Sequence, residues 1–360
     1  YEGSHPFYLN RPRGPTPIVK PTIEHHHSEF RSLTGGVVYH GKVFAELNGV
    51  YVYGDYSTGR IWGARHDGDR LVWQGELAVK PLQIAGFGVD QRGELLIADL
   101  GGGIYRLAPA PKGQPLARFP TRLSETGLFV SVKDHRMQPG VIPYSVNASG
   151  WADGAQAERY LALPGDARIT YKNSRGWDFP NGAVLMQTLS LALEPGNPAS
   201  KRRLETRLLV RQQNEWAGYS YQWNAEQTAA TLVGIKGGES VIHTKDAAAG
   251  GAREQVWRYP SRSECLVCHS RAVNFVLGLT ALQMNKEHDY AGIRDNQLRT
   301  LEHIGMFTGP LPSPREQPGR LANPYDPAAD LDARARSYLH ANCSACHVEA
   351  GGGNAKLELE

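Results

Sequence analysis

The chain has 360 residues, of which 41% are hydrophobic and 21% charged, and its 39 basic and 36 acidic residues give a formal charge of +3. This length exceeds what one hydrophobic core usually serves, so the sequence predicts several domains. No run of like charges indicates nucleic-acid binding, and no run of 18 apolar residues predicts a transmembrane segment. The 40 glycines and 23 prolines favour a loop-rich, mainly β molecule over a helix bundle.

The N-terminal segment, residues 1–110, contains an internal repeat. Gly49–Asp55 is matched by Gly93–Asp99, and each copy is followed by a glycine turn and a second strand. A repeat of about 40–50 residues with several short strands is typical of β-propeller blades. We therefore expect part of a propeller, with further blades before Tyr1. Asp55 and Asp99 precede turns, so we expect them to accept turn hydrogen bonds.

Two stretches of this segment carry a family resemblance. Leu33–Gly41 and Tyr53–Trp62 resemble the closing blades of the glucose/sorbosone dehydrogenase family. The resemblance implies a six-bladed propeller that oxidises sugars or alcohols with pyrroloquinoline quinone (PQQ). It covers structural turns only, so PQQ is expected solely in blades upstream of this chain. The consecutive histidines His25–His27 point to alternate faces of an extended chain and are given no metal role.

The middle segment, residues 118–258, predicts a β-sandwich-like domain. Along one predicted strand, Leu204 and Leu208 alternate with Glu205 and Arg207, which is typical of a half-buried strand. The full set of predicted strands is 159–163, 168–171, 183–193, 203–211 and 216–223. Four tryptophans, either lining a ligand groove or buried in the core, are Trp151, Trp177, Trp216 and Trp223.

The four cysteines of the chain fall in two C-x-x-C-H motifs, Cys265–His269 and Cys343–His347. In a c-type cytochrome, two such thiols bond the porphyrin, and the following imidazole binds the iron. One helical turn separates the thiols, so both reach one edge of the macrocycle. The residues assigned to two covalent hemes c are Cys265, Cys268, His269, Cys343, Cys346 and His347.

Zinc and thiol redox chemistry are the competing interpretations of these cysteines. Zinc ribbons usually hold their pairs about 15–20 residues apart, whereas 74 residues separate Cys268 from Cys343. A histidine also follows both pairs. Neither motif lies in a βαβ unit of the thioredoxin kind. The spacing therefore favours heme.

A small α-helical c-type cytochrome region is predicted around the motifs, at residues 259–320 and 327–360. Helical spacing runs through 272–284 and 295–306, with Gly305 as a stop. Residues 327–339 predict a helix whose apolar face carries Leu331, Ala335, Tyr338 and Leu339. This helix resembles the first helix of a class I cytochrome c, so 327–360 is expected to begin such a domain.

The second axial ligands are less well defined by the sequence. For the first heme we predict Met306, which follows His269 by 37 residues in a glycine-rich turn. Met284, His288 and His303 are the alternatives, and both methionines also suit the core. The 13 residues after His347 contain neither Met nor His. We therefore expect the native chain to continue and to supply a ligand downstream.

Residues 119–360 resemble a family of bacterial diheme c-type cytochromes that are often fused behind propeller dehydrogenases. Beside the two motifs, the likeness rests on 142–147, 177–182, 218–221 and 296–298. The resemblance implies an electron-transfer module that carries electrons from a PQQ-type oxidation, by way of an upstream dehydrogenase domain or a redox partner protein, to an envelope acceptor. It also implies a periplasmic or envelope location. The alternatives are a diheme peroxidase or heme sensor, and a carbohydrate- or partner-binding scaffold with tethered hemes.

Overall fold

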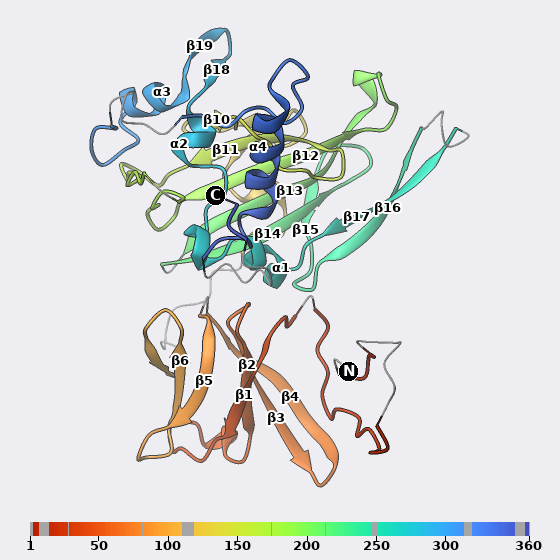
Figure 1. The fold of residues 1–360 in the computed structure, drawn as a ribbon, viewed down its shortest axis with the longest axis vertical. Coiled ribbons are helices and arrows are strands. Elements are labelled where there is room, and N and C mark those ends of the chain that lie inside the picture. Colours follow the sequence, from red (N-terminus) through yellow and green to blue (C-terminus); the bar gives the residue numbers. More distant parts are fainter. Residues whose placement is uncertain are drawn as a thin grey trace. The chain divides into compact units, whose positions relative to one another are not determined.

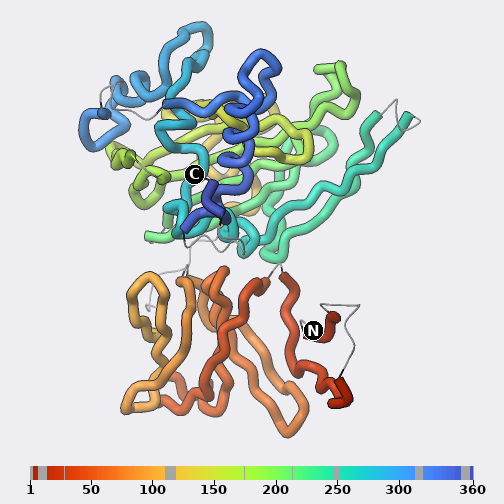
Figure 2. Tube along the Cα trace, in the orientation of Figure 1, coloured from red at the N-terminus to blue at the C-terminus, as the bar shows by residue number. Residues whose placement is uncertain are grey.

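The computed structural model describes residues 3–6, 14–27, 29–80, 82–109, 119–173, 175–212, 214–245, 251–312, 319–349 and 357–359. The chain divides into two compact units, residues 1–116 and 117–360. Figure 1 labels most of their helices and strands, and Figure 2 traces the chain through each unit.

Unit 1 consists of two antiparallel sheets. Four strands pair in chain order in the first sheet and three in the second. The strands of the first sheet are β1 (Leu33–Val38), β2 (Tyr51–Asp55), β3 (Arg60–Asp67) and β4 (Arg70–Val79), with the short 3-10 helix η1 (Ala45–Leu47) between β1 and β2. The strands of the second are β5 (Ile84–Val89), β6 (Leu95–Asp99) and β7 (Ile104–Arg106).

The internal repeat corresponds to equivalent strands in the two sheets, β2 with β6 and β3 with β7. The turn role is confirmed for Asp55, whose carboxylate accepts backbone hydrogen bonds from Ser57 and Thr58 in the turn that follows β2. The carboxylate of Asp99 instead accepts from the backbone of Gln83, just before β5, at 2.8 Å.

The propeller expectation is wrong, because the described strands form two separate sheets and no closed propeller. Apolar residues of both sheets bury one another in a single cluster, which includes Val52 and Ile61 from the first and Ile84 and Ile97 from the second. Each copy of the repeat therefore contributes to one small antiparallel sheet. The two sheets bury each other's apolar side chains.

Unit 2 is built around one antiparallel sheet of six strands that pair in chain order, from β10 to β15. The strands of this sheet are β10 (Ile142–Tyr144), β11 (Gln156–Ala162), β12 (Val184–Ala192), β13 (Lys201–Gln212), β14 (Glu215–Trp223) and β15 (Ala230–Leu232). The smaller β-elements are the hairpins β8 (Phe129–Ser131) with β9 (Arg136–Met137), β16 (Gly238–Thr244) with β17 (Arg253–Tyr259), and β18 (Glu287–Tyr290) with β19 (Ile293–Asn296).

The sandwich expectation is also wrong, because no second large sheet packs on this one in the described ranges. One apolar cluster of the sheet includes Leu123 and Phe129 from the segment before β10. Another includes Trp177, Val276 and Leu301 from connecting segments. Irregular segments and short helices thus do the covering that a second sheet does in a sandwich.

Strand β13 is buried on both faces, whereas the alternation of apolar and charged residues along it predicted burial of one face only. Glu205 is fully buried, and a register shift in the pairing with β12 places Arg203, not Leu204, opposite Ser190. Leu204 therefore packs with Trp257, while Leu208 belongs to a different cluster. The strand predicted at 168–171 is reduced to isolated bridges, one of them between Ile169 and Phe307. The other four predicted strands are confirmed as β11 to β14.

The prediction of a small α-helical cytochrome region at residues 259–320 and 327–360 is wrong. The described residues contain four α-helices, and three of them span seven residues or fewer. These helices are α1 (Arg262–Cys268), α2 (Ala281–Met284), α3 (Gln297–His303) and α4 (Leu331–Cys343). The 3-10 helix η4 (Arg271–Val273) lies between α1 and α2, and the 3-10 helices η2 (Leu123–Glu125) and η3 (Pro198–Ser200) lie earlier in the unit. Residues 272–280 form no long helix, since Asn274 and Phe275 adopt left-handed backbone angles. Gly305, with φ +74°, does stop the helix before it.

The apolar face predicted for the last helix is solvent-exposed. Leu331 is 73% exposed, and Tyr338 and Leu339 are also exposed, while Ser337 is buried. The helix turns its small and polar side toward the unit. Three of the four tryptophans, Trp177, Trp216 and Trp223, are buried core residues, and Trp151 is exposed.

Candidate heme-attachment site

The first motif begins where β17 ends. Pro260 prevents the strand from passing straight into a helix. Ser261 then caps α1, because its side chain accepts a hydrogen bond from the backbone N–H of Glu264. In return, the Glu264 carboxylate accepts from the backbone N–H of Ser261 at 2.7 Å. Arg258 holds the same carboxylate. The capping box fixes where the helix starts and therefore where Cys265 and Cys268 lie.

The two thiols of α1 have different surroundings. Cys265 rests on β14 at Gly218, where an added Cβ would lie 2.5 Å from the Cys265 Cβ and 2.7 Å from its Sγ. Burial raises the pKa of the Cys265 thiol to about 12. Cys268, one turn later, is exposed. Glycine at position 218 is thus what lets the helix approach the sheet so closely.

His269 is held in one tautomer. Its Nδ1 lies 2.7 Å from the carbonyl oxygen of Phe275. A carbonyl only accepts, so Nδ1 carries the proton and Nε2 keeps its lone pair for a metal. Burial lowers the pKa of His269, which favours the neutral ring that metal binding requires.

The loop that presents the Phe275 carbonyl is tied to the rest of the unit by Asn274. Its side-chain amide donates to the Gly176 carbonyl at 2.8 Å and to Asp178 at 2.7 Å. Both Asn274 and Phe275 have positive φ angles, 53° and 62°. Asparagine tolerates this conformation well. The carbonyl that holds the His269 ring is therefore itself positioned by the contacts of Asn274.

A buried charge network lies beneath the motif. The carboxylate of Glu205 accepts two bonds from Arg207, both 2.9 Å, together with bonds from Ser220 and Trp257. The positive charge of Arg207 opposes the rise that burial causes in the pKa of Cys265, and it adds to the lowering that burial causes in the pKa of His269. The carboxylate is fully satisfied, so the arginine is fixed beside the motif.

The second motif lies at the end of α4. Asp330 caps the helix by accepting from the backbone of Ala333 at 2.9 Å, and near its other end Asn342 accepts from the backbone of Trp151 at 2.6 Å. The backbone of His347 donates to Cys343 at 2.9 Å. His347 Nδ1 is buried and has no hydrogen-bond partner within the described part of the chain. Unlike His269, this imidazole has no anchoring carbonyl.

The structure brings the two motifs together. Ala272 and Val273, just after the first motif, form one buried cluster with Val348 and Ala345 of the second. All four cysteines are described, and no disulfide joins them. No group of three histidine, cysteine or acidic side chains converges on a metal position in the described ranges. A tetrahedral zinc site made of both cysteine pairs is therefore not assembled.

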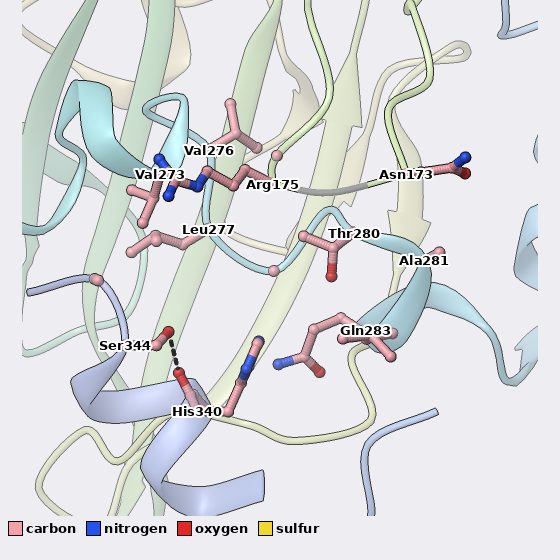
Figure 3. A pocket seen from close by; sticks show the side chains of 15 residues that line it. Asn173, Arg175, Val273, Val276, Leu277, Thr280, Ala281, Gln283, His340 and Ser344 are labelled. Carbon is pink, nitrogen blue, oxygen red and sulfur yellow. Dashed lines mark hydrogen bonds between the residues drawn. The ribbon is translucent and has the colours of Figure 1, made fainter. Parts of the chain in front are cut away.

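A cavity of about 250 Å³ lies between the end of α4, the segment that follows the first motif, and the segment of Arg175 and Gly176 (Figure 3). Each motif supplies the donors that a heme c requires, two thiols and a histidine. None of these donors lines the cavity, whose wall includes the apolar side chains of Val276 and Leu277. The cavity falls below the roughly 300–1,000 Å³ of typical ligand pockets, so the segments must separate to admit a macrocycle. The donor set fits the group, and the volume requires an opening.

The predicted ligand Met306 lies elsewhere in the unit. It is half-buried against the cluster that contains Trp177, and its backbone carbonyl accepts from Ile169 at 2.8 Å. Met284 is fully buried in the same cluster. His288 lies 3.0 Å from the Ser145 hydroxyl. Both methionines thus have core contacts, and iron ligation by Met306 stays a prediction.

Sequence reasoning missed four residues that shape the site: Gly218, Asn274, Arg207 and His340. Gly218 falls in a segment, 218–221, that was noted only for its likeness to a family. Asn274 and Arg207 carry no motif, and their roles depend on contacts between residues distant in the chain. His340, which lines the cavity, lies three residues before Cys343, and this spacing is the signal that could have drawn attention to it.

Comparisons with known proteins add no assignment. No family model and no solved structure matches the chain. None of the helices in the described ranges has the length and apolar character needed to cross a membrane.

Proposed function

We propose that this chain is an electron-transfer module that carries two covalent hemes c, one at Cys265, Cys268 and His269 and one at Cys343, Cys346 and His347. The observation that carries the proposal is the shared cluster of Ala272, Val273, Ala345 and Val348. Two heme-type motifs that are 74 residues apart in the chain are brought into contact by their flanking residues. Such contact suits direct electron exchange between two attached groups.

The residues of the chain have separate tasks in this module. Heme, when bound, supplies reversible one-electron exchange at iron. Phe275 holds His269 with Nε2 available, and Asn274 keeps the Phe275 carbonyl in place. The small side chains of Ala272 and Ala345 let the two motif segments approach closely. The protein thus sets ligation, distance and burial.

The source and destination of the electrons are part of the same proposal. Electrons come from an upstream dehydrogenase domain of the PQQ type or from a redox partner protein, and they leave to an acceptor in the cell envelope. Covalent heme attachment takes place outside the cytoplasm, so the module works in the periplasm or at the envelope.

The test is the heme content of protein expressed with heme-maturation machinery. We expect the intact mass and the pyridine hemochrome spectrum to show two covalent hemes per chain. In matched variants, Cys265→Ser with Cys268→Ser and Cys343→Ser with Cys346→Ser should each retain one heme. Absence of covalent heme from the unmodified chain, with zinc recovered instead, would overturn the proposal.

Carbon monoxide separates electron transfer from the heme-enzyme alternatives. A transfer module keeps both iron positions ligated, so the reduced protein should bind no carbon monoxide. Binding at one heme indicates an open position and supports a diheme peroxidase or sensor instead.

A further inference from the structure

A second hollow in unit 2, of about 610 Å³, shares no lining residue with the cavity near α4. Its volume is within the roughly 300–1,000 Å³ of typical ligand sites. One side is the β16–β17 hairpin, which Figure 1 shows extending beyond the main sheet, and the other is the turn that follows Trp151. We call this hollow the hairpin groove, and its lining includes Trp151, Asp153, Leu191, Arg253, Gln255 and Val256.

The two sides of the hairpin groove are tied together by hydrogen bonds. The side-chain amide of Gln255 donates to the backbone carbonyl of Asp153 at 2.8 Å. The backbone N–H of Trp151 donates to the side chain of Asn342 in α4 at 2.6 Å. Leu191, which also lines the groove, is buried in a core cluster that includes residues of β17. The groove therefore exists before any ligand arrives, which lowers the entropic cost of binding.

Trp151 presents a large apolar ring in this groove. It is 57% exposed, unlike Trp177, Trp216 and Trp223, which are buried in the core of the same unit. Val256 lines the same groove and is 59% exposed. An exposed indole can stack against a flat ligand face and can also donate a hydrogen bond from Nε1. The groove thus combines an aromatic platform with a neighbouring apolar side chain.

Charged side chains of both signs lie beside this platform. Neither the carboxylate of Asp153 nor the guanidinium of Arg253 forms a hydrogen bond or ion pair with any residue that the structure describes. Lys245 pairs with Glu194 and so adds no net charge. One free acid and one free base give the groove no overall sign, so it selects neither a strongly anionic nor a strongly cationic ligand. Both side chains remain available to hydroxyl groups, which donate and accept.

We propose that the hairpin groove binds a neutral oligosaccharide. A pyranose ring has an apolar face of C–H bonds and a rim of hydroxyl groups, so it needs an aromatic platform next to hydrogen-bonding groups of both kinds. Trp151 supplies the platform, and Asp153 and Arg253 supply an acceptor and donors. A wholly apolar ligand would remove these charges from water without replacing their hydrogen bonds, which costs free energy. The site goes beyond electron transfer and requires no heme.

The test is isothermal titration calorimetry of the full chain with cellotetraose, maltotetraose and xylotetraose. We expect at least one of them to bind with a dissociation constant of about 1 mM or lower. Trp151→Ala should weaken this binding by at least about tenfold. Trp73→Ala is the matched control, because Trp73 is also exposed, at 41%, but lies in unit 1. It should bind the saccharide as the unmodified chain does, and the melting temperatures of both variants show that they are folded.

The outcomes separate this inference from the proposed function. If none of the three saccharides binds at about 10 mM, or if Trp151→Ala binds as tightly as the unmodified chain, the groove is not a saccharide site. If a uronic acid tetrasaccharide binds more tightly than all three, the neutral class is wrong. If saccharides do not bind and Trp151→Ala instead slows electron transfer to a soluble cytochrome c, the exposed indole serves a protein partner. Absence of covalent heme from a chain that binds saccharide overturns only the proposed function.

Discussion

Replacing Gly218 with alanine tests the close approach of α1 to β14. The new Cβ would lie 2.5 Å from the Cys265 Cβ, whereas carbon atoms in contact lie about 3.5–4.0 Å apart. The helix must therefore move outward by about 1 Å. Overpacking of this kind costs about 1–3 kcal/mol of unfolding free energy. For a unit of this size the melting temperature should fall by about 2–12 °C.

The assay is urea or thermal unfolding followed by tryptophan fluorescence, with Gly88→Ala as the control. Gly88 lies in strand β5, and an added Cβ there meets nothing within 4 Å. That substitution should be neutral or stabilising by up to about 1 kcal/mol. If Gly218→Ala matches the unmodified protein in stability, and Cys265 stays as slow to alkylate, α1 does not rest on Gly218.

Three further predictions concern the same unit. In the apo protein near pH 8, iodoacetamide should alkylate Cys268 much faster than Cys265, because burial raises the pKa of the Cys265 thiol. Peptide mass mapping measures the two rates, and equal rates would contradict the burial of Cys265. A hydrogen bond from His135 lowers the pKa of Glu158 to about 2 from 4.5, so the ionised carboxylate stabilises the fold above pH 4.5 and this contribution disappears as the pH falls toward 2. The Glu158 side chain is 40% exposed, so Glu158→Gln should cost only about 1 kcal/mol at pH 7 and nothing near pH 2, as measured by urea unfolding at each pH. Asn274→Ala should lower the free energy of unfolding by about 2–3 kcal/mol, because two hydrogen bonds are lost and alanine must adopt a left-handed backbone conformation. Asn274→Gly should recover about 1 kcal/mol of this loss. Equal losses in the two variants would show that the left-handed backbone conformation adds no cost.

The sequence predicted local features well where one residue type determines the backbone. The turn aspartate Asp55 accepts the expected bonds from Ser57 and Thr58, because a carboxylate at the end of a strand lies within reach of the backbone N–H groups of the next turn. The stop at Gly305 follows from its positive φ. Four of the five strands predicted in the middle segment exist, since their apolar and β-branched residues favour extended chain.

The architecture was predicted less well, because it depends on what covers each apolar face. The alternation of residues along β13 predicted that one face of the strand is exposed to solvent. In the structure, a register shift in the pairing with β12 turns Leu204 to that face, where it is buried with Trp257, and the sequence pattern does not reveal the shift. The helices around the first motif are short because Asn274 and Phe275 turn left-handed to meet a distant segment. The meeting of the two motifs through Ala272 and Val348 is likewise a long-range packing result.

The enclosure of Cys265 between α1 and β14 has a consequence for the order of events during biosynthesis. The Cβ and Sγ atoms of Cys265 face Gly218 of β14, so under the proposed heme attachment this thiol can reach a porphyrin vinyl group only while α1 is away from the sheet. The proposal therefore carries a requirement of timing: heme must be bonded at the first motif before α1 docks, by maturation machinery that acts on a chain that is still open.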